Sequence, residues 1–468
     1  YYARLAMAVA ENSSRLLEGW EAAPVFKTRI GIIGPAALAI RLTGPGEWAV
    51  IAHSFAASLG GILLAFWAGR YFFGSRAGLI AAGIQALVPL DARLATMFLP
   101  DLPMAVWGNA VFVLLLAGLK KDKAADRISL GAGAGMAFGL AWLCKESAVF
   151  LIPAVIVIGI AATLRNTDHW KVLGACATGW LFVGLAEGWF YYFRTGDFLY
   201  RFHAVEQSYE VARDWFFAEG SPYGWKEGGY GAALLRRLFL TGPKTLFLNP
   251  NFAWIPAPAL IAAILVLFKK NRTATLAACW FLSLVIIYNF APTGPGGYRP
   301  LVLGYEFSRY LLPILLPAIV LIAGMIDELF QQRNKWKTAA AILIPVILLF
   351  SSLHGLYGYV LAGPGSPVER QVAGRLSPEE EIYTDSRSAQ ILWFFRGYPE
   401  EKRTHEFSSM KAGDIPAGSV VLIQPGRLEY LSQLYQYPAP EFAEDIPAEW
   451  DMEWKFGRSK LYRVKNHE

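Results

Sequence analysis

A series of apolar runs, most of them near the length that crosses a membrane, fills the chain between residues 47 and 362. A spanning helix needs about 20 mainly apolar residues, and lipid tolerates no unpaired backbone, so such runs constrain the fold strongly. They predict a polytopic α-helical membrane protein with about ten spans. The predicted spans are Trp48–Gly69, Ala77–Leu90, Leu102–Leu119, Ile128–Leu143, Ala148–Leu164, Val172–Phe193, Phe252–Phe268, Ala274–Pro292, Phe307–Ile326 and Thr338–Leu361.

Composition changes on either side of this region, which indicates three parts. Only 17% of the residues are charged, against about 25% in soluble proteins, but charge returns at ordinary density after residue 362. Residues 363–468 combine strand-like runs, such as Ser419–Ile423, with helical patterns, such as Ser388–Phe395. They predict a small soluble α/β domain. We expect residues 1–46 to form a first outer loop with amphipathic interfacial helices.

Lysine and arginine residues gather in alternate loops, and this alternation predicts the orientation. By the positive-inside rule the basic loops face the cytoplasm. We therefore expect segments 1–46 and 194–250 and the domain 363–468 on the periplasmic or extracellular side of the cell membrane. The loops also explain the net charge of +6, so no nucleic-acid partner is expected. The basic residues of the five loops are Arg70 and Arg76; Lys120, Lys121, Lys123 and Arg127; Arg165 and Lys171; Lys269, Lys270 and Arg272; and Arg333, Lys335 and Lys337.

Segment 194–250 interleaves aromatic and charged side chains, including Tyr200, His203, Glu206 and Trp215. Such a mixture is typical of a helix that lies in the lipid headgroup layer with its rings down and its charges up. We therefore expect membrane lipids as partners and an amphipathic wall on the outer side.

Charged residues at the outer ends of spans are the candidate functional residues, because an ionisable group near lipid is costly. Asp101 heads the third span, where it is either a helix N-cap or a general base or metal ligand at the membrane surface. Asp91 and Arg93 precede it and could pair locally. His53 lies within an apolar run and is interpreted as a packing residue.

Lys145 and Glu146 separate two apolar runs with almost no loop between them. Either they form an ion pair at a tight hairpin, or Lys145 binds an anionic group such as a lipid phosphate. Arg29, at the start of an apolar segment near the N-terminus, is expected to contact headgroups.

Arg309 lies between Glu306 and Tyr310 at the outer start of the ninth span. It either extends to the interface, as basic side chains near helix ends do, or holds a phosphate, whose oxygens match the guanidinium fork. The sequence has no glycine-rich phosphate loop, HExxH motif or metal-type His/Cys cluster, and its three cysteines lack CxxC spacing.

Three stretches together resemble the GT-C membrane glycosyltransferases that use polyprenyl-phosphate sugars. The likeness is to the protein O-mannosyltransferase and aminoarabinose-transferase-like group, glycosyltransferase family 39-like. The stretches are GRYFFGSRAGLIAAGIQALVPLDARLATMFLPDLPMAVWGNAVFVLLL, WLCKESAVFLIPAV and SRYLLPILLPAIVLIAG.

The resemblance implies a GT-C-like fold and a hexosyl or pentosyl transferase that takes its sugar from a polyprenyl-phosphate donor, with inversion. The acceptor, a protein, lipid or glycan, is left open, as is a divalent ion (Mg²⁺ or Mn²⁺). An acid expected upstream of Tyr1 would be the base. The roles implied for this chain are catalytic for Asp101 and Asp91, donor-phosphate binding for Arg309, Lys145 and Arg93, and supporting for Glu146, Glu306, Tyr310, Arg29, His203 and Glu206.

Two other classes remain as alternatives. A transporter or flippase of a lipid-linked or small substrate would place charges near the midplane and show repeated halves. No convincing internal repeat is visible. A membrane scaffold without catalytic activity is the third class.

Overall fold

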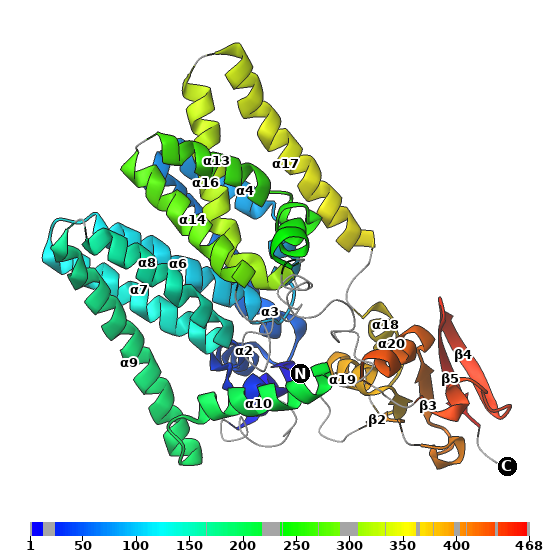
Figure 1. Cartoon of the computed structure of the whole chain (residues 1–468). Coiled ribbons are helices and arrows are strands. Elements are labelled where there is room, and N and C mark those ends of the chain that lie inside the picture. Colours follow the sequence, from blue (N-terminus) through cyan, green and yellow to red (C-terminus); the bar gives the residue numbers. More distant parts are fainter. Residues whose placement is uncertain are drawn as a thin grey trace.

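The computed structural model shows a helical bundle joined to a small α/β domain (Figure 1). It describes residues 2–12, 24–164, 166–217, 235, 237–269, 271–290, 308–332, 334–361, 366–377, 379–396, 403–408, 410–435 and 439–465.

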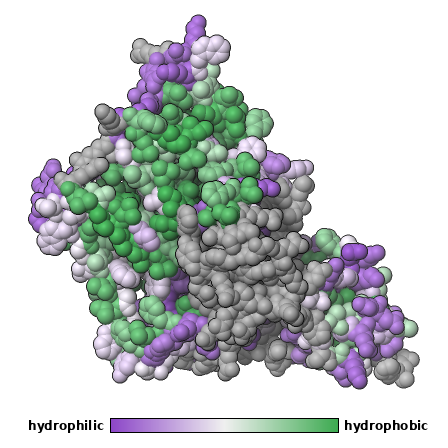
Figure 2. All heavy atoms as spheres, viewed as in Figure 1, coloured by the Kyte–Doolittle hydropathy of each residue, from purple (hydrophilic) through white to green (hydrophobic). Residues whose placement is uncertain are grey.

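Within the described residues, seven helical stretches are long and apolar enough to cross a membrane. Further predicted spans correspond to the shorter helices α13 (Pro256–Phe268) and α14 (Arg272–Phe290). Hydrophobic side chains cover much of the visible bundle surface, and polar ones gather at its ends (Figure 2). The chain is therefore a multi-pass membrane protein. The seven stretches contain α3 (Glu47–Phe73), α6 (Asp101–Leu119), α7 (Ala124–Cys144), η3 and α8 (Glu146–Leu151 and Ile152–Thr163), η4 and α9 (Thr167–His169 and Trp170–Thr195), η7 and α16 (Ser308–Ile314 and Leu315–Gln331) and α17 (Lys335–Leu361).

The second predicted span is broken. Helices α4 (Ser75–Ala86) and α5 (Pro89–Ala95) meet at an angle of 63°. Pro89 has no N–H and disfavours the helical conformation at the residue before it, and Val88 is extended (φ −67°, ψ 117°). The break turns α5 inward, where Asp91 is buried.

The bundle packs closely where small residues face each other. At Gly135 on α7 a Cβ atom would collide with the carbonyl oxygen of Cys176 on α9, and at Gly139 it would lie 2.5 Å from Val183. Membrane helices associate through such close backbone approach, because apolar side chains gain little by leaving lipid. These glycines therefore fix how α7 and α9 meet.

Successive helices run in opposite directions, so the loops alternate between the two ends of the bundle (Figure 1). The described basic loops that were predicted to share one face lie at one end. Asp101, Lys145 and Arg309 lie at the opposite end, as does the attachment of the C-terminal domain at α18 (Pro367–Ala373). Which side of the membrane this end faces stays a prediction.

Short helices and α10 cover the end of the bundle that carries Asp101. Helix α10 runs across this end and contacts η2 (Figure 1). Its position in the headgroup layer stays a prediction. The elements are α1 (Tyr2–Glu11), η2 (Pro24–Thr28), α2 (Ile30–Thr43), α10 (Tyr200–Phe217), η5 (Arg237–Thr241), α12 (Gly242–Phe247) and η6 (Pro250–Phe252).

The C-terminal domain contains a five-stranded sheet in the order β2-β1-β3-β5-β4. Strand β1 pairs parallel with β2 and β3, whereas β5 pairs antiparallel with β3 and β4. The predicted α/β character of this domain is confirmed. Its elements are β1 (Ile382–Thr384), α19 (Ser386–Phe395), β2 (Thr404–Glu406), η8 (Ala412–Asp414), β3 (Val420–Ile423), α20 (Pro425–Tyr435), η9 (Glu441–Ala443), β4 (Trp450–Phe456) and β5 (Ser459–Val464).

Two adjacent residues of α18 make opposite contacts. Glu369 is fully buried in the C-terminal domain, where its carboxylate meets Arg427 at 2.9 Å and accepts a hydrogen bond from Ser388. Arg370 pairs at 2.6 Å with Glu47, the first residue of α3. Helix α18 therefore contacts both parts of the molecule.

Candidate active site

Asp101 and Lys145 form a buried ion pair at the end of the bundle. Asp101 lies in the first turn of α6 and is 1% exposed, and Lys145 directly follows α7 and is 2% exposed. The Lys145 Nζ atom lies 2.6 Å from Asp101 Oδ1. Pro100 occupies the N-cap position and the Asp101 side chain makes no cap hydrogen bond, so the N-cap interpretation of Asp101 was wrong.

Arg309 and Tyr310, at the start of η7, complete this group. Arg309 Nε lies 3.9 Å from Asp101 Oδ2, and about a third of its side chain is exposed. Lys145 Nζ lies 3.6 Å from the centroid of the Tyr310 ring, a distance at which the ring face stabilises a cation. The carboxylate of Asp101 is thus shared by two cations, of which Arg309 reaches the surface.

Glu146 and Arg29 form a second pair directly beside the first. The Arg29 guanidinium donates to both carboxylate oxygens of Glu146, at 2.6 and 3.0 Å, and it also donates to the Tyr2 hydroxyl. Burial raises the pKa of Tyr2, so its phenol stays neutral. Consecutive residues Lys145 and Glu146 therefore have different partners, and the predicted alternative of a mutual hairpin pair was wrong.

The charge balance of this group favours an anionic ligand. Among the described residues of the group, Arg29, Lys145 and Arg309 supply three positive charges, and Asp101 and Glu146 supply two negative charges. Charge-assisted hydrogen bonds to a phosphate are strong, and the arginine fork fits two of its oxygens. The group can therefore bind a phosphate through the partly exposed Arg309.

The other predicted site residues that the structure describes are not brought into this group. Asp91 lies in a separate pocket, where it accepts hydrogen bonds from Gln85 and Ser58, so a local pair with Arg93 was wrong. Arg93 is exposed, and none of the described contacts joins it to the group.

His203 and Glu206 are exposed on α10. The His203 Nδ1 atom lies 2.7 Å from Asp197 Oδ2. Glu306 lies outside the described residues.

A further buried ion pair, between α10 and α9, had not been predicted either. The guanidinium of Arg201 on α10, a residue that is 2% exposed, lies 2.6 Å from the carboxylate of Glu187 on α9, and its Nη1 atom also donates to the Thr28 carbonyl at 3.1 Å. The Trp142 indole donates to the other Glu187 oxygen at 2.9 Å. The sequence did contain a signal for this pair: Glu187 lies within the apolar run Val172–Phe193, and a glutamate in such a run needs a partner.

A metal ion finds no support in the described geometry. Among the described residues no three His, Cys, Asp or Glu side chains are grouped to hold one. Asp101 was the predicted ligand, but Lys145 and Arg309 already neutralise it. A divalent ion at this site stays a prediction.

The helix arrangement matches solved membrane glycosyltransferases. Apo ArnT from Cupriavidus metallidurans aligns with a TM-score of 0.60 at 15% identity, over 98% of this chain and 92% of ArnT. ArnT bound to undecaprenyl phosphate gives 0.57 at 16% identity over the same shares. The Archaeoglobus fulgidus oligosaccharyltransferase in complex with Zn and sulfate gives 0.52 at 12% identity, over 99% of this chain and 69% of that one. The chain therefore has the GT-C fold.

One segment of the chain also matches a family model. Residues 35–186 match the dolichyl-phosphate-mannose-protein mannosyltransferase family. No curated protein sequence matches the chain. The resemblance inferred from the sequence motifs is thus confirmed.

Proposed function

We propose that this chain is a membrane glycosyltransferase that moves a sugar from a polyprenyl-phosphate donor to an acceptor at the outer face of the cell membrane. The observation that carries the proposal is the cationic group of Arg29, Lys145 and Arg309 at one end of a GT-C bundle. The undecaprenyl phosphate bound to ArnT and the name of the matched family support a lipid-linked donor.

Arg309 and Lys145 would neutralise the donor phosphate. As an acceptor hydroxyl attacks the anomeric carbon, the bond from that carbon to the phosphate oxygen breaks and polyprenyl phosphate leaves with the electron pair. Cations held in place stabilise the negative charge that develops on the leaving group. One such displacement inverts the anomeric centre. The proton of the acceptor goes to a base that we do not assign among the described residues.

Asp101 acts in this scheme as a positioning residue. Its carboxylate is buried and shared by Lys145 and Arg309, so it is poorly placed to take a proton from an acceptor. Because Asp101 holds Lys145 and Arg309 in place, the two cations can stabilise the charge of the leaving phosphate without moving first. This role replaces the general base as our hypothesis for Asp101.

Binding of undecaprenyl phosphate to the purified chain tests the proposal, with undecaprenol as the ligand that lacks the phosphate. Arg309→Ala should weaken binding of the phosphate lipid by about 10- to 100-fold, because a hydrogen bond to a charged group contributes about 1.5–3 kcal/mol. Binding of undecaprenol should not change. The matched control is Arg41→Ala, which removes an exposed arginine from α2 and should bind both lipids as the unmodified chain does.

Two results would contradict the proposal. If the unmodified chain binds both lipids equally well, it does not recognise the phosphate. If Arg309→Ala weakens the binding of both lipids to the same degree, Arg309 supports the fold and does not recognise the phosphate.

The transporter alternative has one observation in its favour, the broken α4–α5 pair with Asp91 buried beside the break. Transporters build ion sites from such discontinuous helices. Release of polyprenyl phosphate from a sugar-loaded donor would support the transferase. Counterflow of solute across vesicles without that release would support the transporter.

A further inference from the structure

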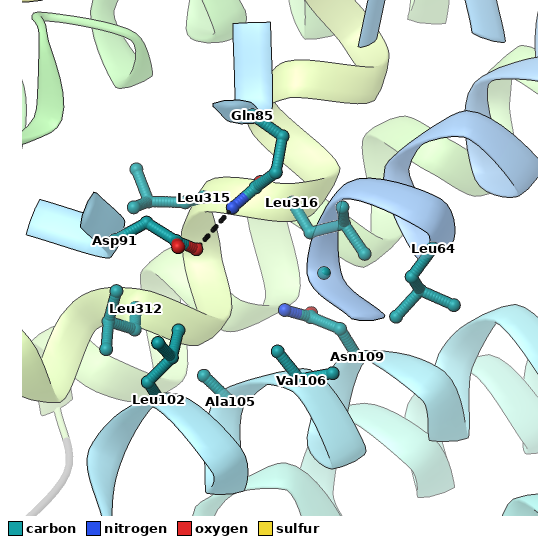
Figure 3. A pocket seen from close by; sticks show the side chains of 11 residues that line it. Leu64, Gln85, Asp91, Leu102, Ala105, Val106, Asn109, Leu312, Leu315 and Leu316 are labelled. Atoms are coloured by element: carbon teal, nitrogen blue, oxygen red, sulfur yellow. Dashed lines mark hydrogen bonds between the residues drawn. The ribbon is translucent and has the colours of Figure 1, made fainter. Parts of the chain in front are cut away.

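A polar pocket lies inside the membrane bundle (Figure 3). Three polar side chains, Gln85, Asp91 and Asn109, face a lining that is otherwise apolar. Asn109 lies eight residues into α6 from Asp101, about 12 Å along the helix axis at 1.5 Å per residue. The apolar and glycine lining is Gly61, Leu64, Leu102, Ala105, Val106, Leu312, Leu315 and Leu316.

Asp91 has no cationic partner among the described residues. It is 3% exposed, and its two oxygens accept one hydrogen bond each, from Ser58 and from Gln85 at 2.7 Å. Both donors are neutral. An ionised carboxylate in low dielectric is costly unless another charge compensates it. The pocket therefore carries one uncompensated negative charge when Asp91 is ionised.

Asn109 adds a buried amide whose oxygen has no hydrogen-bond partner among the described residues. Its residue is 5% exposed, and its Oδ1 atom is buried without a hydrogen bond among the described residues. Figure 3 shows its amide group turned into the space that Gln85 and Asp91 also face. A buried amide oxygen left unpaired costs about 1–3 kcal/mol. The pocket thus holds a carboxylate with neutral partners only and a buried amide oxygen without a described partner, and no cation among the described residues compensates the carboxylate.

We propose that this pocket binds one monovalent cation of the size of Na⁺. A carboxylate and amide oxygens are ligands that hard cations prefer. One carboxylate balances one positive charge, whereas a divalent ion would leave a positive charge buried in the membrane. The pocket has room for little more than one water-sized particle.

The site would connect the break in the second span to the active-site end of the bundle. Asp91 comes from α5, Asn109 from α6 and the Leu315 side of the pocket from α16. Asp101 heads α6, and Arg309 begins the helical stretch that continues into α16. A cation between these elements would hold α5 and α6 together. This proposal does not depend on the identity of the sugar donor.

The test is the unfolding temperature of the purified full chain in NaCl and in choline chloride at equal concentrations. A ligand that binds only the folded state stabilises it as its concentration rises. The unmodified chain should unfold at a higher temperature in NaCl, and this increase should saturate with Na⁺. Asp91→Asn should abolish the increase and should be more stable than the unmodified chain in choline chloride.

The matched control is Asp327→Asn, which removes another buried carboxylate on α16, one that accepts a hydrogen bond from Gln331 and pairs with Arg76. It should keep the Na⁺-dependent increase. An unmodified chain that unfolds at the same temperature in both salts would overturn the proposal, because the pocket would then hold water or a proton. A full Na⁺ increase in Asp91→Asn would overturn it too.

If Asp91→Asn does not fold, two milder variants test whether the pocket binds Na⁺. Asn109→Leu removes the unpaired acceptor. Gly61→Ala adds a methyl group at 3.4 Å from Val106 and 3.8 Å from Gln85, ordinary contacts that narrow the space without strain. Both should require at least about tenfold more Na⁺ for the same stabilisation, which corresponds to about 1.4 kcal/mol. Unchanged Na⁺ dependence in both would reject the site.

Discussion

At the scale of single residues, the ion pair of Asp101 with Lys145 determines which charges are available at the candidate active site. Both side chains are almost fully buried. Two charges removed from water lose hydration, and their attraction recovers this loss only while both are present. The pair therefore depends on both partners, and Arg309 depends on it as well.

We predict that Asp101→Asn destabilises the folded chain by about 3–5 kcal/mol, because Lys145 is left buried without its partner. The double variant Asp101→Leu with Lys145→Met should recover most of this stability, since it removes both charges. It should still bind undecaprenyl phosphate more weakly than the unmodified chain. Thermal unfolding and lipid binding of the purified variants measure the two effects. Equal stability of Asp101→Asn and the unmodified chain would show that the pair is not needed.

The sequence identified most of these residues but not their partners. Charges at the outer ends of spans pointed to Asp101, Lys145 and Arg309 because such positions are costly. The partner of Glu146 is Arg29, which lies 117 residues away along the chain. No local pattern reports such a contact, so the sequence suggested a hairpin pair that the structure does not contain.

At the scale of elements, one ion pair fastens α10 to the bundle. Arg201 meets Glu187, the Thr28 carbonyl and the Trp142 ring, whose centroid lies 4.5 Å from its guanidinium carbon. The pair thus joins the consecutive helices α9 and α10 to η2 and to α7, which are distant along the chain. We infer that it holds the first turns of α10 against the end of the bundle.

We predict that Glu187→Gln loosens the start of α10, because it leaves the Arg201 charge buried without a counter-charge. Amide hydrogen exchange over residues 200–208 should speed up by at least about tenfold, as local opening becomes easier. The matched control is Glu206→Gln, which changes an exposed glutamate on the same helix. It should exchange like the unmodified chain. Equal exchange in both variants would mean that other contacts hold α10.

Spans and strands were predictable from periodicity and length, whereas breaks and pockets were not. The apolar run Ala77–Leu90 reads as one span, and Pro89 alone marks where it bends. Asn109 gave no signal, because a single neutral amide in an apolar run is common in membrane helices. Asn109 becomes part of a polar pocket only because the bend between α4 and α5 brings Gln85 and Asp91 beside it.

At the scale of the whole molecule, the two ends of the bundle differ in their charged residues and in what is attached to them. Basic loops lie at one end, where Lys269 of the α13–α14 connection pairs with Glu328. The residues of the candidate active site lie at the other end, and the C-terminal domain is attached there as well (Figure 1). The positive-inside rule assigns the first of these ends to the cytoplasm.

Orientation can be measured with single cysteines, after Cys279 is replaced by serine. We predict that a membrane-impermeant maleimide labels Glu441→Cys, in the C-terminal domain, in intact cells. Asp122→Cys, in a basic loop, should react only after the membrane is opened. Both positions are exposed, so accessibility within the protein does not limit the reaction. Labelling of both positions from the same side would exclude this topology.

The two ion pairs of α18 restrict how the C-terminal domain can be attached to the membrane bundle. Glu369 and Arg370 are neighbours on one rigid turn, yet one is anchored in the sheet domain and the other at the start of α3. Each added residue rotates a helix by about 100°. A one-residue insertion between them would therefore let only one of these anchors engage at a time. Because Glu369 and Arg370 are adjacent, their two ion pairs together restrict the angle between the C-terminal domain and the membrane bundle.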